Sequence, residues 1–146
     1  ITRIWLSSRR STMIESNLES MQEGPNKQRD TRQTFIGNAG RALDAQQGFD
    51  EPSFQRMHFS NAEREMARSM SNPNHRFAEF LAAKEAVSKA LEQAGVRAPS
   101  EWREIELVPD GKEWRVRIAG SPSLVALSLT RVNGYVWAVA SLASAG

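Results

Sequence analysis

The most regular pattern of apolar positions in the chain lies between residues 77 and 91. Its large apolar residues recur at helical spacing and form one stripe, which is typical of a helix that buries one side. Gly95 follows, in the position where glycine commonly ends a helix. We predict a helix from about residue 74 to residue 94, with apolar positions Phe77, Phe80, Leu81, Val87 and Leu91.

A shorter helix is predicted to precede it, beginning after Ser60. Ser60 and Glu63 have the spacing of a capping box, in which each side chain bonds the backbone amide of the other residue. Upstream of it, residues 34–36 are expected to form a short strand that enters residues 37–40. The two glycines there indicate either a turn or a close approach of the backbone to another segment.

The last third of the chain alternates between apolar and polar residues, as antiparallel strands do. Strands are expected over residues 104–108, 114–118 and 124–130. Asn133-Gly134 is a strong signal for a two-residue hairpin turn. The largely apolar segment 135–142 is expected to be a central strand covered on both faces. Helices followed by hairpins predict an α+β fold, with a long central helix packed on an antiparallel sheet.

Composition divides the chain near residue 33. Residues 7–33 are polar, and residues 1–33 are expected to form an extension or linker, whereas residues 34–146 have the character of one domain. The chain has 146 residues and no cysteine, which excludes a thiol nucleophile and a cysteine metal site. No apolar run is long enough to cross a membrane. The net charge of +2 comes from dispersed basic residues, so nucleic-acid binding is not indicated.

Five short segments occur in a recognisable order along residues 35–142. Together they make the chain resemble the 4'-phosphopantetheinyl transferase superfamily, in particular the holo-acyl-carrier-protein synthase type. The resemblance implies the fold of that family, with the long helix packed on an antiparallel sheet. The segments are Ile36-Gly37-Asn38-Ala39, Phe59 to Glu63, Ala82 to Ala86 with Lys89-Ala90-Leu91 behind it, Trp102 to Glu106, and Ser128 to Arg131.

The resemblance implies a reaction and a site. Members of this family move the 4'-phosphopantetheine arm of coenzyme A to a serine of an acyl carrier protein, with Mg²⁺ as the metal. By this resemblance Glu85 holds the metal, and Lys84 lies beside the reacting phosphates, so that both are expected to be catalytic. The resemblance further implies that coenzyme A is bound by Lys84, Lys89, Ser128, Thr130 and Arg131.

Two positions depart from the family pattern. Ala39 stands where a second metal-binding aspartate is expected, and Arg131 stands where a histidine is expected. A methyl group cannot bind a metal, and Asp44 could replace the aspartate only through a shift in register. Two hypotheses follow. The chain is an active transferase with a rearranged site, or it is an inactive transferase-like domain that binds a carrier protein or serves as a structural or oligomerisation module.

Each site residue also has an ordinary structural interpretation. Lys84 and Glu85 are compatible with a solvated helix edge, and Glu63 is expected to be a capping residue rather than a metal ligand.

The short transferases of this family resemble half of the longer ones. The resemblance therefore implies a homo-oligomer, with a trimer as the leading candidate, and a cytoplasmic location.

Overall fold

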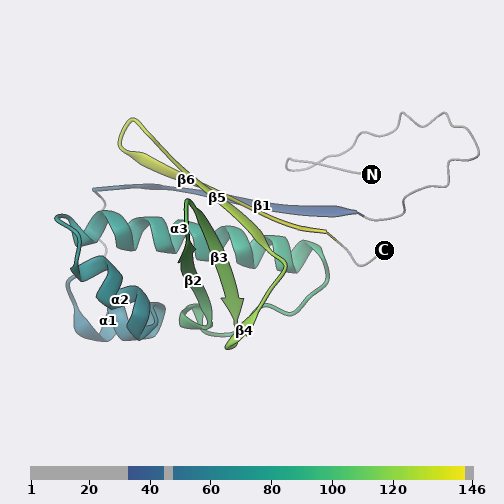
Figure 1. Ribbon diagram of the computed structural model, residues 1–146, viewed down its shortest axis with the longest axis horizontal. Helices are drawn as coiled ribbons and strands as arrows, with labels where there is room; N and C mark the ends of the chain where they lie inside the picture. Colours follow the sequence, from purple (N-terminus) through teal and green to yellow (C-terminus); the bar gives the residue numbers. More distant parts are fainter. Residues whose placement is uncertain (1–32, 45–47, 144–146) are drawn as a thin grey trace, which may run out of the picture.

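The computed structural model describes residues 33–44 and 48–143. It contains one long helix, α3, that lies along an antiparallel sheet, with two short helices on the opposite side of α3 (Figure 1). The elements in chain order are β1 (Thr34–Ala42), α1 (Pro52–His58), α2 (Asn61–Arg68), α3 (Pro73–Gln93), the short 3-10 helix η2 (Trp102–Glu104), β2 (Ile105–Asp110), β3 (Glu113–Ile118), β4 (Ser121–Pro122), β5 (Ala126–Val132) and β6 (Tyr135–Ala143). The predicted α+β class, with a long helix on an antiparallel sheet, is confirmed.

The sheet has the strand order β1-β6-β5-β3-β2, with β4 beside β3. All neighbouring strands are antiparallel. The β5–β6 hairpin turns at Asn133 and Gly134, which both have positive φ angles, of 52° and 79°. These angles are typical of the hairpin turn that Asn-Gly favours, so the predicted turn is confirmed. β3 and β5 are paired only at Trp114 and Leu127, and the two strands diverge on either side of this pair.

Small residues set the distance between α3 and the sheet. The positions of α3 that face the sheet include Ala82, Ala83, Ala86 and Ala90, all fully buried. Gly37 of β1 lies directly against the helix backbone. A β-carbon at Gly37 would overlap the carbonyl oxygen of Ala86 and would lie 2.6 Å from the amide nitrogen of Ala90. Only glycine therefore permits β1 to approach α3 this closely.

The opposite side of α3 is covered by an aromatic cluster. The rings of Phe59 and Phe77 are 4.6 Å apart, and those of Phe49 and Phe77 are 6.0 Å apart. Phe49 lies in the loop before α1 and Phe59 directly follows α1, and both side chains are almost completely buried. α3 is therefore buried on two opposite sides, and the sheet, α3 and the short helices form three layers.

The structure corrects three sequence predictions. Of the two alternatives for residues 37–40, the turn is wrong, because β1 is one continuous strand, and the close backbone approach is confirmed at Gly37. Helix α1 was not predicted, because its seven residues have no buried stripe. Strand β6 is central but is not covered on both faces. Tyr135, Trp137 and Val139 are about half exposed, since no described element lies over that face.

No helix in the described residues is both long and apolar enough to cross a membrane. The predicted extension over residues 1–33 lies outside the described residues, apart from Gln33.

Candidate functional site

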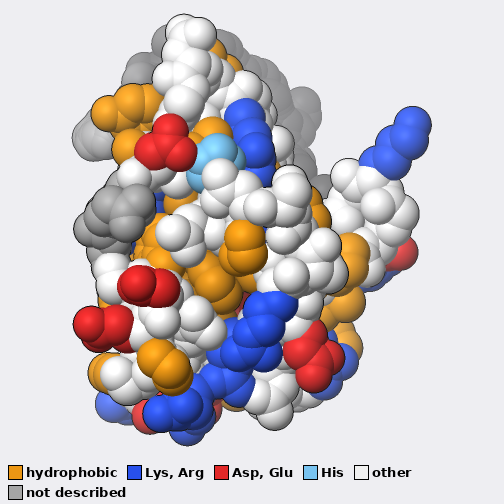
Figure 2. Space-filling view, turned by 90° about the vertical axis from the view of Figure 1, so that its left-hand side faces the viewer, with side chains coloured by type: hydrophobic (Ala, Val, Ile, Leu, Met, Phe, Trp, Pro, Cys, Tyr) orange, Lys and Arg blue, Asp and Glu red, His pale blue; other side chains and the backbone are white. Residues whose placement is uncertain are grey.

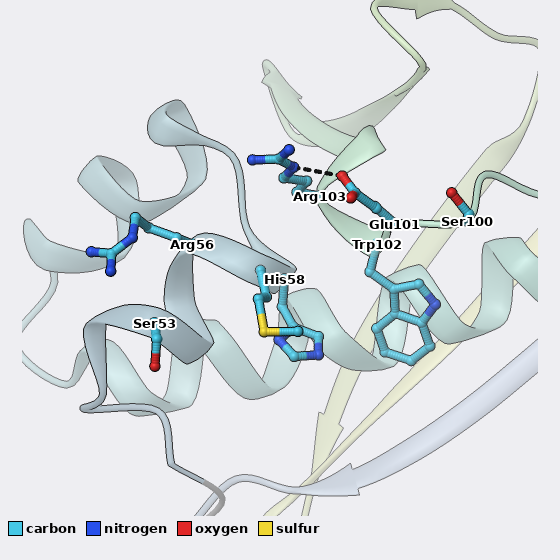
Figure 3. Close-up of a pocket in the computed structure, with 8 residues that line it drawn as sticks. Ser53, Arg56, His58, Ser100, Glu101, Trp102 and Arg103 are labelled. Atoms are coloured by element: carbon cyan, nitrogen blue, oxygen red, sulfur yellow. Dashed lines mark hydrogen bonds and ion pairs between the residues drawn. The ribbon is translucent and has the colours of Figure 1, made fainter.

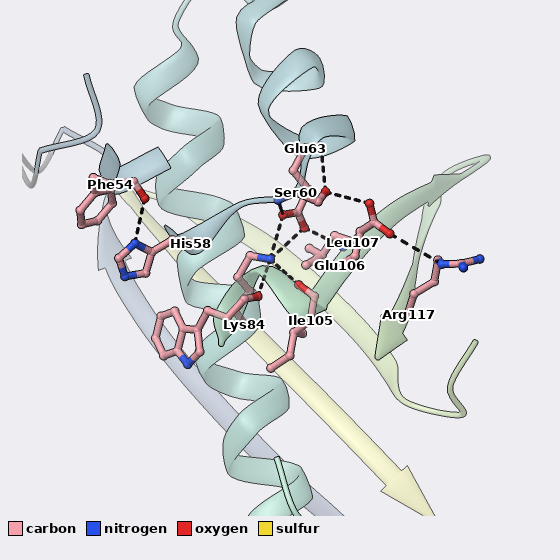
Figure 4. A network of polar contacts seen from close by, with 10 residues as sticks. Phe54, His58, Ser60, Glu63, Lys84, Ile105, Glu106, Leu107 and Arg117 are labelled. Carbon is pink, nitrogen blue, oxygen red and sulfur yellow. Dashed lines mark hydrogen bonds and ion pairs between the residues drawn. The ribbon is translucent and has the colours of Figure 1, made fainter. Parts of the chain in front are cut away.

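Lys84 is the first charged residue of the helix segment Ala82 to Ala86, which carries the resemblance to the family, and its side chain is completely buried. Its Nζ donates to both carboxylate oxygens of Glu63, at 2.8 and 3.0 Å. The same ammonium donates to the backbone carbonyl of Trp102 at 3.0 Å and to that of Ile105 (Figure 4). An ammonium has three N–H donors, and all of them are engaged by these acceptors.

Glu63 is buried as completely as Lys84 and connects it to two further segments. Its Oε1 accepts a hydrogen bond from the backbone amide of Ser60 at 3.0 Å, and the Ser60 hydroxyl accepts one from the amide of Glu63. The predicted capping box is therefore confirmed. Its Oε2 accepts from the backbone amide of Leu107 in β2 at 2.8 Å. One ion pair thus joins α2, α3, η2 and β2.

Burial disfavours the charged forms of Glu63 and Lys84, and the charge of each residue partly offsets this shift in the pKa of the other. Desolvation raises the pKa of Glu63, while the positive charge of Lys84 and the hydrogen bonds to the carboxylate lower it. Desolvation lowers the pKa of Lys84, while the charge and hydrogen bond of Glu63 raise it. The expected contact of Lys84 with reacting phosphates stays a prediction. In this structure the donors of Lys84 are engaged within the protein core.

Glu85, the next residue, lies on a different side of α3 and reaches solvent. Its side chain is 35% exposed, and its carboxylate lies 3.4 Å from Nζ of Lys89, one helical turn further on. Lys89 also donates to the backbone carbonyl of Asn38 in β1, at 3.1 Å. β1 is an edge strand of the sheet. Glu85 and Lys89 are therefore brought together at the open edge of β1, and we call this pair the α3 edge site.

Neither of the two positions considered for a second metal ligand supplies a carboxylate beside Glu85. Ala39 presents a methyl group that is 6% exposed within the core. Asp44 pairs with His75 at 2.6 Å, in the first turn of α3. His75 precedes Glu85 by ten residues, which corresponds to about 15 Å along the helix. Among the described residues, no three acidic, histidine or cysteine side chains are grouped so that they could hold a metal ion.

The three β5 residues expected to bind coenzyme A lie on two faces of the sheet. Ser128 and Thr130 are exposed on the face that points away from α3, where they pair with Val139 and Trp137 of β6. Arg131 points toward α3, and its Nε lies 2.6 Å from a carboxylate oxygen of the buried Glu79. Within one chain, the structure does not bring the β5 residues to the α3 edge site.

A concave region lies between α1 and η2 (Figure 3), and the sequence analysis did not predict it. Its volume is about 580 Å³. The indole of Trp102 and the ring of His58 lie 6.2 Å apart, and Met57 beside them is 66% exposed. The lining residues are Ser53, Arg56, Met57, His58, Ser100, Glu101, Trp102 and Arg103, which we call the α1–η2 groove.

Positive charge predominates in the α1–η2 groove. Its one carboxylate, Glu101, pairs with Arg103 at 2.9 Å. Arg56 forms no ion pair with any described residue. Figure 2 shows the end of the molecule where α1 and α2 lie, with apolar side chains exposed between charged ones. No sequence signal indicates this groove, because α1 has no buried stripe and joins η2 only in the folded chain.

Comparisons with known proteins agree with this fold. The family model described as the 4'-phosphopantetheinyl transferase superfamily matches residues 42–140, which is more than half of the chain. The match begins after Ala39 and therefore does not bear on the aspartate expected there. A search of curated proteins gave no match.

Several solved structures share the fold at low sequence identity. The ACPS–CoA complex of Chronobacterium ammoniagenes has a TM-score of 0.60 and 24% identity, covering 75% of this chain and 96% of that one. The holo-[acyl-carrier-protein] synthase of Neisseria meningitidis has a TM-score of 0.60 and 21% identity, with coverages of 73% and 95%. The Bacillus anthracis synthase in complex with CoA (3',5'-ADP) has a TM-score of 0.56 and 22% identity, with coverages of 76% and 96%.

Replacing Lys84 by methionine is expected to lower the free energy of unfolding by about 3–5 kcal/mol, because the Glu63 carboxylate stays buried without its counter-charge. Without Lys84, burial raises the pKa of Glu63 further above its ordinary value of 4.5. A carboxyl group whose pKa is higher in the folded state than in the unfolded state stabilises the folded protein at low pH. This stabilisation is lost as the pH rises through the pKa of the folded state. Urea denaturation should therefore show that Lys84→Met loses more unfolding free energy at pH 8 than at pH 5.

The control for this prediction is Lys84→Met combined with Glu63→Gln, which removes the buried charge. The double variant should recover part of the stability and lose the added pH dependence. Equal destabilisation of Lys84→Met at both pH values would contradict the assignment of a buried, ionised Glu63.

Proposed function

This chain belongs to the 4'-phosphopantetheinyl transferase superfamily, and we propose on that basis that it transfers the phosphopantetheine arm of coenzyme A to a serine of an acyl carrier protein. The observation that carries the proposal is the α3 edge site. A carboxylate and an ammonium lie 3.4 Å apart on the solvent side of the helix motif that the family shares. A cytoplasmic location is part of the same proposal.

The residues present fit a magnesium ion that is shared with the substrate. Mg²⁺ in phosphate-transfer sites is commonly held by only one or two protein carboxylates, with phosphate oxygens and water as the remaining ligands. Glu85 supplies one carboxylate, and its partial exposure leaves the carboxylate oxygens accessible. When bound there, the ion would neutralise negative charge on the pyrophosphate.

The protein groups around Glu85 suit the binding of a pyrophosphate. Lys89 is half exposed and would donate a charge-assisted hydrogen bond to a phosphate oxygen. Its bond to the Asn38 carbonyl holds the ammonium at the β1 edge while the substrate binds. The attacking hydroxyl belongs to the carrier protein, so this chain needs no nucleophile of its own. The serine oxygen bonds to the phosphorus of the phosphopantetheine arm as the pyrophosphate P–O bond to the leaving nucleotide breaks, and the hydroxyl proton passes to solvent.

A complete site is proposed to need more than one copy of the chain. Ser128 and Thr130, expected to contact coenzyme A, lie on the outer face of the sheet and are separated from Glu85 in one chain. That outer face carries apolar side chains that no described element covers, namely Val132, Tyr135, Trp137 and Val139, which are 44–51% exposed. An interface over this face would bury them and would place the β5 residues of one copy near a neighbouring copy. We propose a homo-oligomer, with a trimer as the specific candidate.

The carrier protein is proposed to dock at the α1–η2 groove. Acyl carrier proteins are acidic, and the groove combines Arg56, which has no ion pair among the described residues, with an exposed Met57. An apolar anchor surrounded by opposite charge is the usual composition of a protein-binding surface.

An alternative function follows from Ala39. Its buried methyl group offers no second metal ligand, which favours a domain that binds a carrier protein or coenzyme A without turnover. The two functions differ in one observable, which is the transfer of the phosphopantetheine arm.

Transfer of a fluorescent pantetheine arm from labelled coenzyme A to apo carrier proteins, with and without Mg²⁺, tests the catalytic proposal. Glu85→Gln should lower kcat/KM by more than about 100-fold, because loss of a direct metal ligand exceeds the roughly 10–100-fold typical of groups that only support a ligand. Glu92→Gln, an exposed carboxylate near the end of the same helix, should leave transfer unchanged. Labelling only in Ala39→Asp would support the inactive alternative, and no labelling in any variant would reject the enzymatic function.

The oligomer is tested by placing a charge on the outer sheet face. Val139→Lys should shift the mass measured by light scattering from a multiple of 16.3 kDa to a single chain, because a lysine ammonium would be buried at the interface. Lys112→Glu, outside this face, serves as the control. A parent protein that is already a single chain at micromolar concentration would contradict the proposal.

The docking proposal predicts a charge-dependent change in the KM for the carrier protein. Arg56→Glu should raise that KM by about tenfold and leave kcat nearly unchanged, because opposite charges across an interface mainly affect encounter and binding. Arg115→Glu is the matched control, since Arg115 is 75% exposed and lies outside the groove. Equal effects of both variants would indicate a general charge effect rather than a docking site.

A further inference from the structure

We infer that Lys84 is a positioning residue, whose contacts with Glu63 and two backbone carbonyls set the rotation of α3 and so determine where Glu85 is presented. This inference rests on the proposed function only for the role of Glu85. It assigns to Lys84 a task other than contact with phosphate.

The contacts around Lys84 are directional and come from separate parts of the fold. Its Nζ lies within 3.0 Å of both Glu63 carboxylate oxygens and of the Trp102 carbonyl. It also donates to the carbonyl of Ile105. These acceptors belong to α2, η2 and β2, so the ammonium can keep all of them in only one rotational setting of α3. The amide of Leu107 fixes the carboxylate in turn.

The other directional contacts that join α3 to the rest of the fold each involve a partly or largely exposed side chain: Arg131 with Glu79, Lys89 with the Asn38 carbonyl, and Asp44 with His75. The remaining contacts of α3 are apolar. On the sheet side the helix presents alanines, and β1 presents Gly37. This packing sets the distance between helix and strand, but nearly identical methyl groups offer little resistance to rotation about the helix axis. On the opposite side the phenylalanine rings are apolar, and their contacts do not require one orientation of the helix backbone. The Lys84–Glu63 pair differs from the other directional contacts because both side chains are completely buried, so water cannot replace a contact that rotation breaks. For this reason the Lys84 contacts are the main constraint on rotation.

Rotation of α3 affects the edge site directly, because Glu85 is the next residue after Lys84. Successive residues of an α-helix are separated by about 100° around the helix axis. When Lys84 points into the core, Glu85 therefore points toward the open edge of β1. A rotation of roughly 20° would move a side-chain terminus about 5–6 Å from the axis by close to 2 Å. Errors of about 1 Å at a reacting group can cost roughly 100-fold in rate.

The variant that separates positioning from stability is Lys84→Met combined with Glu63→Leu. Replacing a buried ion pair by apolar residues of similar volume often preserves or improves stability. Arg115→Met combined with Asp110→Leu is the matched control, since it removes an exposed ion pair of 2.6 Å and introduces the same two residue types. Circular dichroism should show both double variants folded. The control should melt close to the parent, whereas the Lys84–Glu63 variant should melt at a lower temperature, because the amide of Leu107 and the carbonyls of Trp102 and Ile105 lose their partners.

Helix rotation can be measured without any activity, because the chain contains no cysteine. Spin labels on Asn38→Cys in β1 and Glu92→Cys in α3 report the distance between strand and helix by electron paramagnetic resonance, and both positions are exposed. The Lys84–Glu63 variant should shift or broaden the distance distribution, whereas the control variant should keep that of the parent. In the unlabelled protein, kcat should fall at least tenfold and the KM for carrier protein should change less than twofold.

An unchanged distance distribution in the folded Lys84–Glu63 variant would overturn the inference, whatever its activity. Parent-like kcat in that variant would overturn it as well. A shifted distribution in a chain whose parent transfers nothing would support the control of helix rotation by Lys84 and would reject the proposed function separately.

Discussion

The buried ion pair between Lys84 and Glu63 is the interaction on which the arrangement of this fold depends. Removing two charges from water costs several kcal/mol for each ion, and the cost is recovered only when the pair and its remaining hydrogen bonds are well formed. Here the ammonium and the carboxylate also bind four backbone groups, which belong to the start of α2, to η2 and to β2. Because any displacement leaves a buried charge unsatisfied, the pair selects one relative arrangement of these segments.

The sheet side of α3 is governed by a different constraint, which is size. Glycine and alanine allow β1 and β6 to approach the helix backbone, and Gly37 has no room for a β-carbon. This close layer leaves the other face of β6 without a cover among the described residues. The packing therefore buries one face of the sheet and leaves Trp137 and its neighbours exposed on the other face. That exposed face is the surface of the proposed oligomer interface.

These constraints divide the family-like residues among distinct environments. Lys84 belongs to the core, Glu85 and Lys89 to the open β1 edge, and Ser128 with Thr130 to the outer sheet face. Arg131 is directed inward by Glu79. A motif that looks contiguous in sequence thus has one buried charge and one accessible charge, since adjacent helix positions point in directions about 100° apart. The proposed need for a second copy follows from this division.

The sequence by itself determined the features that depend on neighbouring residues. These are the long helix, the capping box of Ser60 and Glu63, the Asn133-Gly134 turn and the order of the family motifs, since each is a pattern of local spacing. It also predicted the α+β class. Only the tertiary structure decided that Lys84 is buried, that residues 37–40 continue a strand, and that α1 and η2 form a groove. In each case the partners are distant in sequence, and local patterns do not encode which distant groups meet.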